Sequence, residues 1–276
     1  MTKNKSIGIF DSGFGGLDIM KGIVKELPNY NFIYLGDTAR VPYGVRSEKV
    51  LYKFTKQAVD FLFKKKCEII IFACNTVSSN ALRKIQKKYI PKYYPGKKAL
   101  GVIIPAVELA VQKTKNKKVG VIATLRTVES KSFLREFSKI DNNIKIFQKD
   151  CPLLVPIIEA GEIKTEKINE VLENYLKPLI DKKIDTLILG CTHYGILKNK
   201  IKKIIGNNIK IIVESDIVAK KLKDYLRRHQ EIEKKIGREK KRIFYSTGLV
   251  KKFEILGKHF YGEKIKVQKI KLSKNL

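Results

Sequence analysis

The sequence contains no long apolar run, and this absence argues against a protein that crosses a membrane on apolar helices. No segment approaches the roughly 18 consecutive apolar residues that such a helix requires. Residues 1–6 are polar and do not form the apolar stretch of a secretory signal peptide. We therefore expect a cytoplasmic protein, and its 276 residues are enough to bury a core in one or two domains.

Arginine is scarce, although the excess of positive charge is large. Lysine and arginine together number 58, and aspartate and glutamate 27, which gives a net charge of +31. Only nine of the 58 are arginine, the residue favoured for bidentate contacts with phosphate and guanine. The lysines are scattered and often accompany isoleucine and asparagine, as in 201–205. This pattern favours a solvated surface and makes nucleic acid an unexpected partner.

Cysteine is scarce as well, and its spacing argues against two kinds of site. The four cysteines stand at positions 67, 74, 151 and 191, and no two form a Cys-x-x-Cys pair. We therefore expect no metal site, and no disulfide framework in a reducing compartment. Cys67 follows three lysines and Cys151 precedes a proline, so both are interpreted as core residues. Cys74 and Cys191 remain candidates for chemistry.

Short apolar runs alternate with longer amphipathic segments along the chain. The expected strands are residues 6–10, 31–36, 68–73, 99–104, 118–123, 144–148, 186–190, 209–214, 242–247 and 264–272. The expected helices include residues 49–65, 80–89, 126–139, 165–182 and 217–228. Such alternation predicts an α/β fold with mainly parallel sheets, in which ligands bind beyond the carboxyl ends of the strands.

Two pairs of strand ends resemble each other at similar distances along the chain. Residues 7–12 resemble 119–124 at an offset of 112, and residues 73–76 resemble 190–193 at an offset of 117. The offsets indicate an internal duplication and two similar α/β domains. The second domain is expected at 99–212. Residues 1–98 and 213–276 are expected to form the first, because a tail of about 60 residues would be a marginal domain alone.

Cys74 and Cys191 each directly follow a predicted strand, which places both thiols at the ligand-binding edge. Nearby helix N-termini are expected to lower the thiol pKa and favour the thiolate. Two acid/base groups on opposite faces of one carbon suit racemisation or epimerisation, whereas a single nucleophilic cysteine would indicate a hydrolase. Asp11 and His193 are candidate helpers, because a carboxylate or imidazole beside a thiol can accept or steer its proton.

The turn at residues 11–16 is rich in glycine but lacks the pattern of a nucleotide-binding loop. Its glycines fall at 13, 15 and 16, and no Gly-Lys-Ser/Thr follows. Its leading aspartate would repel phosphate. The turn is therefore interpreted either as a tight strand-to-helix connection or as a source of backbone N–H groups for a carboxylate.

Four segments, 11–16, 36–44, 73–76 and 190–194, together resemble the glutamate racemases of the aspartate/glutamate racemase family, and residues 244–248 resemble a late motif of that family. The resemblance implies a cofactor-independent isomerase with two α/β domains related by a pseudo-twofold axis and an active site in the cleft between them. It further implies a supply of D-glutamate for peptidoglycan. The oligomeric state varies in this family, and a homodimer is one expectation.

The resemblance also implies roles for individual residues. Cys74 would deprotonate D-glutamate with help from Asp11, and Cys191 would deprotonate L-glutamate with help from His193. Asp37 and Glu159 match acidic positions that support the site. The residues that would bind the substrate's ammonium and carboxylate groups are Asp11, Ser12, Tyr43, Gly44, Asn75, Thr76, Thr124, Thr192 and His193.

Two alternatives stay open on the sequence. A racemase of the same fold could act on aspartate or another amino acid, but such enzymes typically carry an acid where this chain has His193. The charge of +31 leaves open a basic protein that binds another macromolecule, and some glutamate racemases bind DNA gyrase as a second activity.

Overall fold

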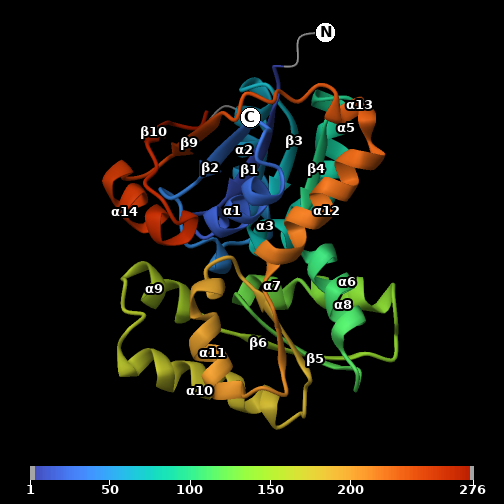
Figure 1. Cartoon of the computed structure of the whole chain (residues 1–276), viewed down its shortest axis with the longest axis vertical. Helices are drawn as coiled ribbons and strands as arrows, with labels where there is room; N and C mark the ends of the chain where they lie inside the picture. Colours follow the sequence, from blue (N-terminus) through green and yellow to red (C-terminus); the bar gives the residue numbers. More distant parts are fainter. Residues whose placement is uncertain (1–3, 274–276) are drawn as a thin grey trace.

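Two parallel β-sheets form the framework of the computed structural model, which describes residues 4–273 (Figure 1). The larger sheet has the strand order β10-β9-β2-β1-β3-β4, and the smaller has the order β6-β5-β7-β8. Adjacent strands run parallel in both sheets. The predicted α/β fold with parallel sheets is therefore confirmed.

The six-stranded sheet is buried on both faces, as its sequence requires. Its central strands are nearly continuous apolar runs rather than alternating ones, which is typical of a parallel sheet covered by helices on both sides. The strands are β1 (Ser6–Asp11), β2 (Phe32–Gly36), β3 (Cys67–Phe72), β4 (Lys98–Gly101), β9 (Arg242–Ser246) and β10 (Val267–Lys269).

The four-stranded sheet repeats part of this arrangement. Its strands are β5 (Lys118–Ala123), β6 (Lys145–Asp150), β7 (Thr186–Gly190) and β8 (Lys210–Ile212). Its order β6-β5-β7-β8 matches the order β2-β1-β3-β4 within the larger sheet. In this match β5, β6, β7 and β8 correspond to β1, β2, β3 and β4. The shared order supports the internal duplication that the sequence predicts. The ends of β3 and β7, after which Cys74 and Cys191 follow, are therefore equivalent positions.

Helices cover both sheets, and most of them connect consecutive parallel strands (Figure 1). Before β5, in chain order, they are α1 (Gly16–Glu26), η1 (Tyr43–Val45), α2 (Glu48–Lys64), α3 (Asn75–Asn80), α4 (Leu82–Lys84), the π-helical η2 (Ile85–Tyr89), α5 (Ile90–Tyr93) and α6 (Ile103–Lys113), the last of which packs against the smaller sheet. The rest are α7 (Leu125–Glu129), α8 (Ser132–Ser138), α9 (Leu154–Glu159), α10 (Glu166–Ile180), η3 (Tyr194–Leu197), α11 (Lys198–Ile205), α12 (Glu214–Arg228), α13 (Gln230–Glu233) and α14 (Val250–Tyr261).

The C-terminal part of the chain lies against the first sheet. Helix α12 packs on α1, and β9 and β10 extend the six-stranded sheet beside β2. One buried apolar cluster runs through both halves and includes Ile7 of β1 and Leu187 of β7. The two separate sheets support a division into two units, and the contacts of α12, β9 and β10 support a tail that returns to the first unit. We propose this as the domain organisation, with the shared apolar cluster packing the two units together.

Four segments differ from the sequence prediction. The helix expected at 126–139 is divided at residues 130–131 into α7 and α8, where Lys131 adopts a left-handed backbone conformation. The strand expected at 99–104 ends at Gly101 and pairs with β3, so it belongs to the six-stranded sheet and not with the segment 99–212. The proposed boundary therefore follows β4. The helix expected at 80–89 is divided into short α-helical and π-helical pieces. The strand expected at 264–272 spans only Val267–Lys269.

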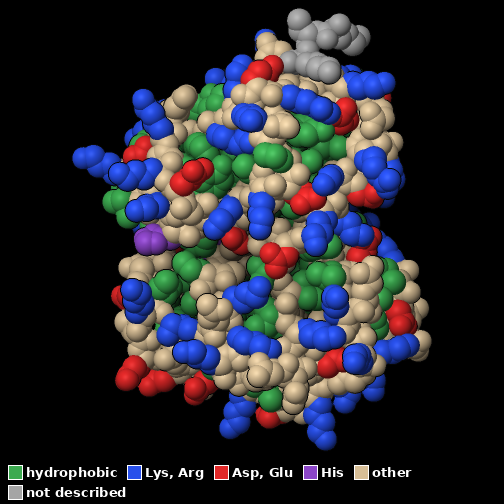
Figure 2. Space-filling model, viewed as in Figure 1, with side chains coloured by type: hydrophobic (Ala, Val, Ile, Leu, Met, Phe, Trp, Pro, Cys, Tyr) green, Lys and Arg blue, Asp and Glu red, His purple; other side chains and the backbone are tan. Residues whose placement is uncertain are grey.

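The surface carries its charge in a dispersed form. Figure 2 shows Lys and Arg side chains spread over both halves of the visible face, with Asp and Glu between them. No single basic patch dominates this face, as the scattered lysines of the sequence predict. Among residues 4–273, no helix has the length and apolar character needed to span a bilayer.

Candidate active site

A cavity of about 150 Å³ gathers most of the residues that the sequence singles out. Both candidate thiols line it, and each stands at the carboxyl end of a parallel strand, where ligands of such sheets bind. The predicted residues in its wall are Ser12, Tyr43, Gly44, Cys74, Asn75, Thr76, Thr124, Glu159, Cys191, Thr192 and His193.

Cys74 lies at the end of β3, where it immediately precedes α3. Its Sγ is 3.5 Å from the hydroxyl oxygen of Ser12, which follows the neighbouring strand β1. Burial and the nearby charge of Asp11 raise the pKa of Cys74 to about 11, although the hydrogen bond with Ser12 acts in the opposite direction. The thiol form therefore predominates at neutral pH in the site as it stands.

Asp11 lies behind the cavity wall rather than in it. The carboxylate is fully buried and accepts hydrogen bonds from the backbone N–H of Gly13, at 2.8 Å, and from the hydroxyl of Thr192, at 3.4 Å. Burial raises the pKa of Asp11, and the charge of His193 opposes that increase. Asp11 thus connects the Cys74 side of the site to Thr192 on the other half.

Cys191 follows β7 and has an imidazole as its neighbour. Its Sγ is 3.8 Å from Nδ1 of His193, and Nε2 of the same ring is 3.2 Å from Oε1 of Glu159. The rings of Phe14 and Phe260 pack edge-on against His193, each with a centroid distance of 5.8 Å. The imidazole is therefore held between the thiol and a carboxylate, in a position to exchange a proton with Cys191.

The pKa values of the two thiols correct one prediction. Helix N-termini were expected to lower them, but burial raises the pKa of Cys191 well above its ordinary value, as it does for Cys74. The backbone N–H of His193 lowers the pKa of Cys191, but burial has the larger effect. Helix α3 has only six residues, so its N-terminus offers little compensation for the loss of water.

The loop between β2 and α2 brings Tyr43 and Gly44 to the cavity. The hydroxyl of Tyr43 donates to Asp37, which is fully buried and also accepts from Arg40 Nε at 2.6 Å. Asp37 therefore fixes the loop from behind. A Cβ atom at position 44 would lie 2.9 Å from Cβ of Thr124, so only glycine allows this approach of the two halves.

Two hydroxyl groups meet across the halves at the far side of the cavity. Oγ1 of Thr76, in α3, is 3.0 Å from Oγ1 of Thr124, which follows β5 and caps α7. Thr76 follows β3 of the larger sheet and Thr124 follows β5 of the smaller one, so each half contributes one hydroxyl. The pair provides hydrogen-bonding groups that can hold a carboxylate between the two halves.

Several residues of the site escaped the sequence analysis. Cys151 lines the cavity although the sequence suggests a core residue, and it is indeed buried, with a raised pKa. Glu214 accepts a 2.7 Å hydrogen bond from Asn75 and follows β8, so the strand-end pattern could have identified it. The apolar wall consists of Val41, Pro42, Val45, Leu125, Pro152, Val155 and Pro156, which no polar motif marks.

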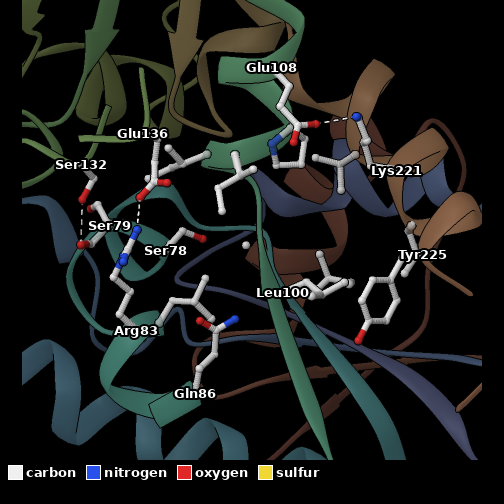
Figure 3. A pocket seen from close by; sticks show the side chains of 18 of the residues that line it. Ser78, Ser79, Arg83, Gln86, Leu100, Glu108, Ser132, Glu136, Lys221 and Tyr225 are labelled. Atoms are coloured by element: carbon white, nitrogen blue, oxygen red, sulfur yellow. Dashed lines mark hydrogen bonds and ion pairs between the residues drawn. The ribbon is translucent and has the colours of Figure 1, made fainter. Parts of the chain in front are cut away.

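A larger cavity of about 430 Å³ lies elsewhere between the two halves. Figure 3 shows that its wall includes the ion pairs Arg83–Glu136 and Lys221–Glu108, and that Ser132 donates to the backbone oxygen of Ser79. Among the described residues that line it there is no cysteine or histidine. Despite its smaller volume, the cavity with the two thiols is therefore the candidate active site.

Comparison with known proteins identifies relatives of the whole chain. The family model described as Asp/Glu/hydantoin racemase matches residues 7–221. The glutamate racemase of Thermoanaerobacter sp. (strain X514) is 40% identical over 261 residues, which cover 95% of each chain. The glutamate racemase of Enterococcus faecalis is 37% identical over 280 residues, which cover 100% of this chain and 99% of the relative.

Solved structures of similar proteins have the same fold. The glutamate racemase isoform RacE1 of Bacillus anthracis superposes with a TM-score of 0.89 at 32% identity, covering 98% of this chain and 99% of the other. The glutamate racemase of Francisella tularensis, solved in complex with D-glutamate, superposes with a TM-score of 0.87 at 35% identity and the same coverage.

Proposed function

The chain belongs to the Asp/Glu/hydantoin racemase family, and from this membership we infer that it is an amino-acid racemase that interconverts L- and D-glutamate. We propose that the reaction proceeds by proton transfer between Cys74 and Cys191. The observation that carries this mechanism is that two thiols at equivalent strand ends line one cavity. Neither thiol has a disulfide partner.

The proposed reaction needs one thiolate and one thiol. The thiolate of Cys74 removes the α-proton of D-glutamate, and the thiol of Cys191 delivers a proton to the opposite face of the same carbon. The product is L-glutamate, with Cys74 left protonated and Cys191 left as the thiolate. The reverse reaction exchanges the two roles, so the protons balance over each turnover.

Because burial raises the pKa of both thiols, the bound substrate must help to form the thiolate. An ammonium group near a thiol favours the thiolate, so binding of the amino acid offsets part of the effect of burial. His193 is placed to accept the proton of Cys191 and return it, and the Glu159 carboxylate lies 3.2 Å from the other nitrogen of the ring. Asp11, behind the cavity wall, is close enough to both thiols for its charge to raise the pKa of each, and Thr192 donates a hydrogen bond to it.

Removal of the α-proton leaves negative charge that spreads onto the α-carboxylate. We propose that Ser12, Thr76, Thr124 and Thr192 provide hydrogen bonds that stabilise this charge, with Tyr43, Gly44 and Asn75 completing the binding surface. Loss of one such donor typically raises a reaction barrier by about 2.7–4 kcal/mol. Asp37 contributes indirectly, by holding Tyr43.

The four cysteines also support a location for the enzyme. All four are free and buried, and thiols persist in a reducing compartment. We propose that the enzyme works in the cytoplasm and that its D-glutamate enters peptidoglycan synthesis, the role that resemblance to glutamate racemases implies.

We propose that the chain forms a homodimer. Support comes from two large apolar side chains near the C-terminus: Leu249 is 70% exposed and Ile255, in α14, is 65% exposed. Burial of both in a symmetric contact would remove them from water. Sedimentation equilibrium should give twice the chain mass, and Leu249→Lys with Ile255→Lys should give the monomer. A monomeric wild type at micromolar concentration would contradict this assembly.

A racemisation assay without added cofactor tests the proposed function. Purified protein should convert either enantiomer of glutamate to the racemate, and aspartate offered at the same concentration should react more slowly. Faster turnover of aspartate would assign the chain to the alternative substrate. Absence of glutamate turnover by folded protein would contradict the proposal.

A further inference from the structure

Glu214 is a buried carboxyl group that the proposed proton transfer does not use. It is 3% exposed, and its Oε2 accepts a hydrogen bond of 2.7 Å from Nδ2 of Asn75. Burial raises the pKa of Glu214, and the hydrogen bond from Asn75 opposes that increase. Burying a carboxyl group costs free energy, so its position calls for a physical explanation.

The hydrogen bond joins two segments that meet behind the active-site cavity. Asn75 directly follows Cys74, begins α3 and lines the cavity. Glu214 begins α12, where the chain passes from the four-stranded sheet to its packing against α1. The partners are 139 residues apart in sequence. The crossing segment therefore supplies a buried acceptor to the residue beside one catalytic thiol.

This hydrogen bond determines which atom of the Asn75 amide remains for a ligand. Nδ2 is engaged by Glu214, while Oδ1 is buried and has no hydrogen-bond partner among the described residues. An unpaired buried acceptor is unfavourable, and such atoms are usually satisfied by water or a ligand. A carbonyl oxygen matches a donor, and the α-ammonium group is the donor that glutamate carries.

We propose that Glu214 is a positioning residue for substrate binding, and this inference rests on the proposed function. Glu214 holds the Asn75 amide by Nδ2, so that Oδ1 accepts a hydrogen bond from the substrate's α-ammonium group. Without Glu214 the amide can rotate and present its N–H₂ group to the ammonium. The contact forms with the bound substrate and persists in the transition state, so its loss raises KM more than it lowers kcat.

A double-mutant cycle between Glu214→Ala and Asn75→Ala tests the inference. Each single variant should raise KM about 10-fold for both enantiomers, with kcat within about threefold of wild type. If Glu214 acts through Asn75, the double variant should have a KM within about twofold of Asn75→Ala. Single effects that multiply in the double variant would overturn the inference.

Two further variants separate positioning from a general effect on folding. Glu214→Gln keeps an acceptor oxygen and should restore KM to within about threefold of wild type. A Gln variant that behaves like the alanine variant would contradict the role. Glu214→Met fills a similar volume without an acceptor, and it replaces alanine in the cycle if the alanine variant does not fold.

Asp60→Ala provides a matched control in the same half of the molecule. Asp60 is 6% exposed and accepts hydrogen bonds from Tyr89 and Tyr94. Its loss should lower Tm without changing KM. If wild-type protein does not turn over glutamate, the proposed function itself is contradicted. If wild-type protein is active but the KM effects of Glu214→Ala and Asn75→Ala multiply in the double variant, only the role of Glu214 is contradicted.

Discussion

The two thiols occupy equivalent positions in a repeated topology, but their surroundings differ. Cys74 has a serine hydroxyl at 3.5 Å, whereas Cys191 has an imidazole at 3.8 Å that contacts a carboxylate. Burial raises the pKa of both. The repeat thus accounts for where the thiols lie, and the residues around each strand end determine how each would exchange its proton.

Removal of either thiol should have the largest effect, because the two are expected to be equally necessary. Cys74→Ala and Cys191→Ala should each lower kcat/KM by about 10²–10⁴ in both directions, the range typical of a lost acid/base group. Cys67→Ala is the matched control: this thiol is fully buried at the start of β3, and its variant should keep activity within about threefold. An active-site variant with activity within tenfold of wild type would contradict the mechanism.

Removal of the helper groups should expose the difference between the halves. The equilibrium constant between enantiomers is 1, so His193→Asn must lower kcat/KM equally in both directions. The asymmetry should instead appear in isotope effects. In His193→Asn the α-deuterium effect should increase more for L-glutamate, because proton removal by Cys191 becomes slower relative to the other steps.

Asp11→Asn should show the opposite preference, with the larger increase for α-deuterated D-glutamate. Both variants should lose about 10²-fold in kcat/KM. Initial rates with α-protonated and α-deuterated substrates of each configuration measure the effect. Equal changes for the two enantiomers in both variants would mean that the helpers are not specific to one thiol.

Loss of the Ser12 hydroxyl should change the pKa of Cys74 and leave the pKa of Cys191 unaltered. Its hydrogen bond lowers the pKa of Cys74, against the larger effect of burial. Ser12→Ala should therefore raise that pKa and move the rising limb of kcat/KM to higher pH, since a smaller fraction of the thiol is ionised at any given pH. A pH profile in the variant that matches wild type would contradict this role.

The smallest effect concerns folding stability and two acids, Glu68 and Asp185. They lie at the amino ends of β3 and β7, opposite to the ends that carry the two thiols. Glu68 in β3 pairs with Lys5, Lys97 and Lys235, and these lysines outweigh burial and lower its pKa to about 2. Asp185, before β7, accepts backbone and hydroxyl hydrogen bonds that likewise outweigh burial and lower its pKa.

Because both pKa values are lowered in the folded state, each acid stabilises the fold above its ordinary pKa and loses this contribution as the pH falls. For Glu68 the loss should extend from about pH 5 to about pH 2. Glu68→Gln and Asp185→Asn should each cost about 1–3 kcal/mol at pH 7 in urea unfolding. Added salt should weaken the Glu68 effect more, since lysine pairs are screened. If salt reduced the destabilisation by Glu68→Gln and by Asp185→Asn equally, the proposed difference between lysine pairing and hydrogen bonding would be contradicted.

The sequence predicts the positions of the chemical groups well and their energetics poorly. Cys74, Cys191 and Thr124 are found from local patterns, because each follows an apolar run that forms a strand. The raised thiol pKa values depend on burial by segments distant in sequence, which no local pattern contains. Glu214 has its partner 139 residues away, so its strand-end position alone could not show what it contacts.

The membership of β4 in the first sheet was missed for a related reason. Residues 98–101 have the composition of a short strand in either half, and only the pairing with β3 decides between them. The shared strand order of the two sheets could be anticipated, because two motifs recur at similar offsets. The repeat was therefore visible in the sequence, whereas its boundary was not.

Racemisation in deuterium oxide tests the two-thiol mechanism most directly. If one thiol removes the α-proton and the other delivers a solvent-derived proton, the first product formed from either enantiomer should carry deuterium at the α-carbon, while the remaining substrate keeps its protium. Mass spectrometry of the separated enantiomers at early times gives both values. Early product that retains protium, or substrate that gains deuterium as fast as product forms, would contradict transfer between two thiols.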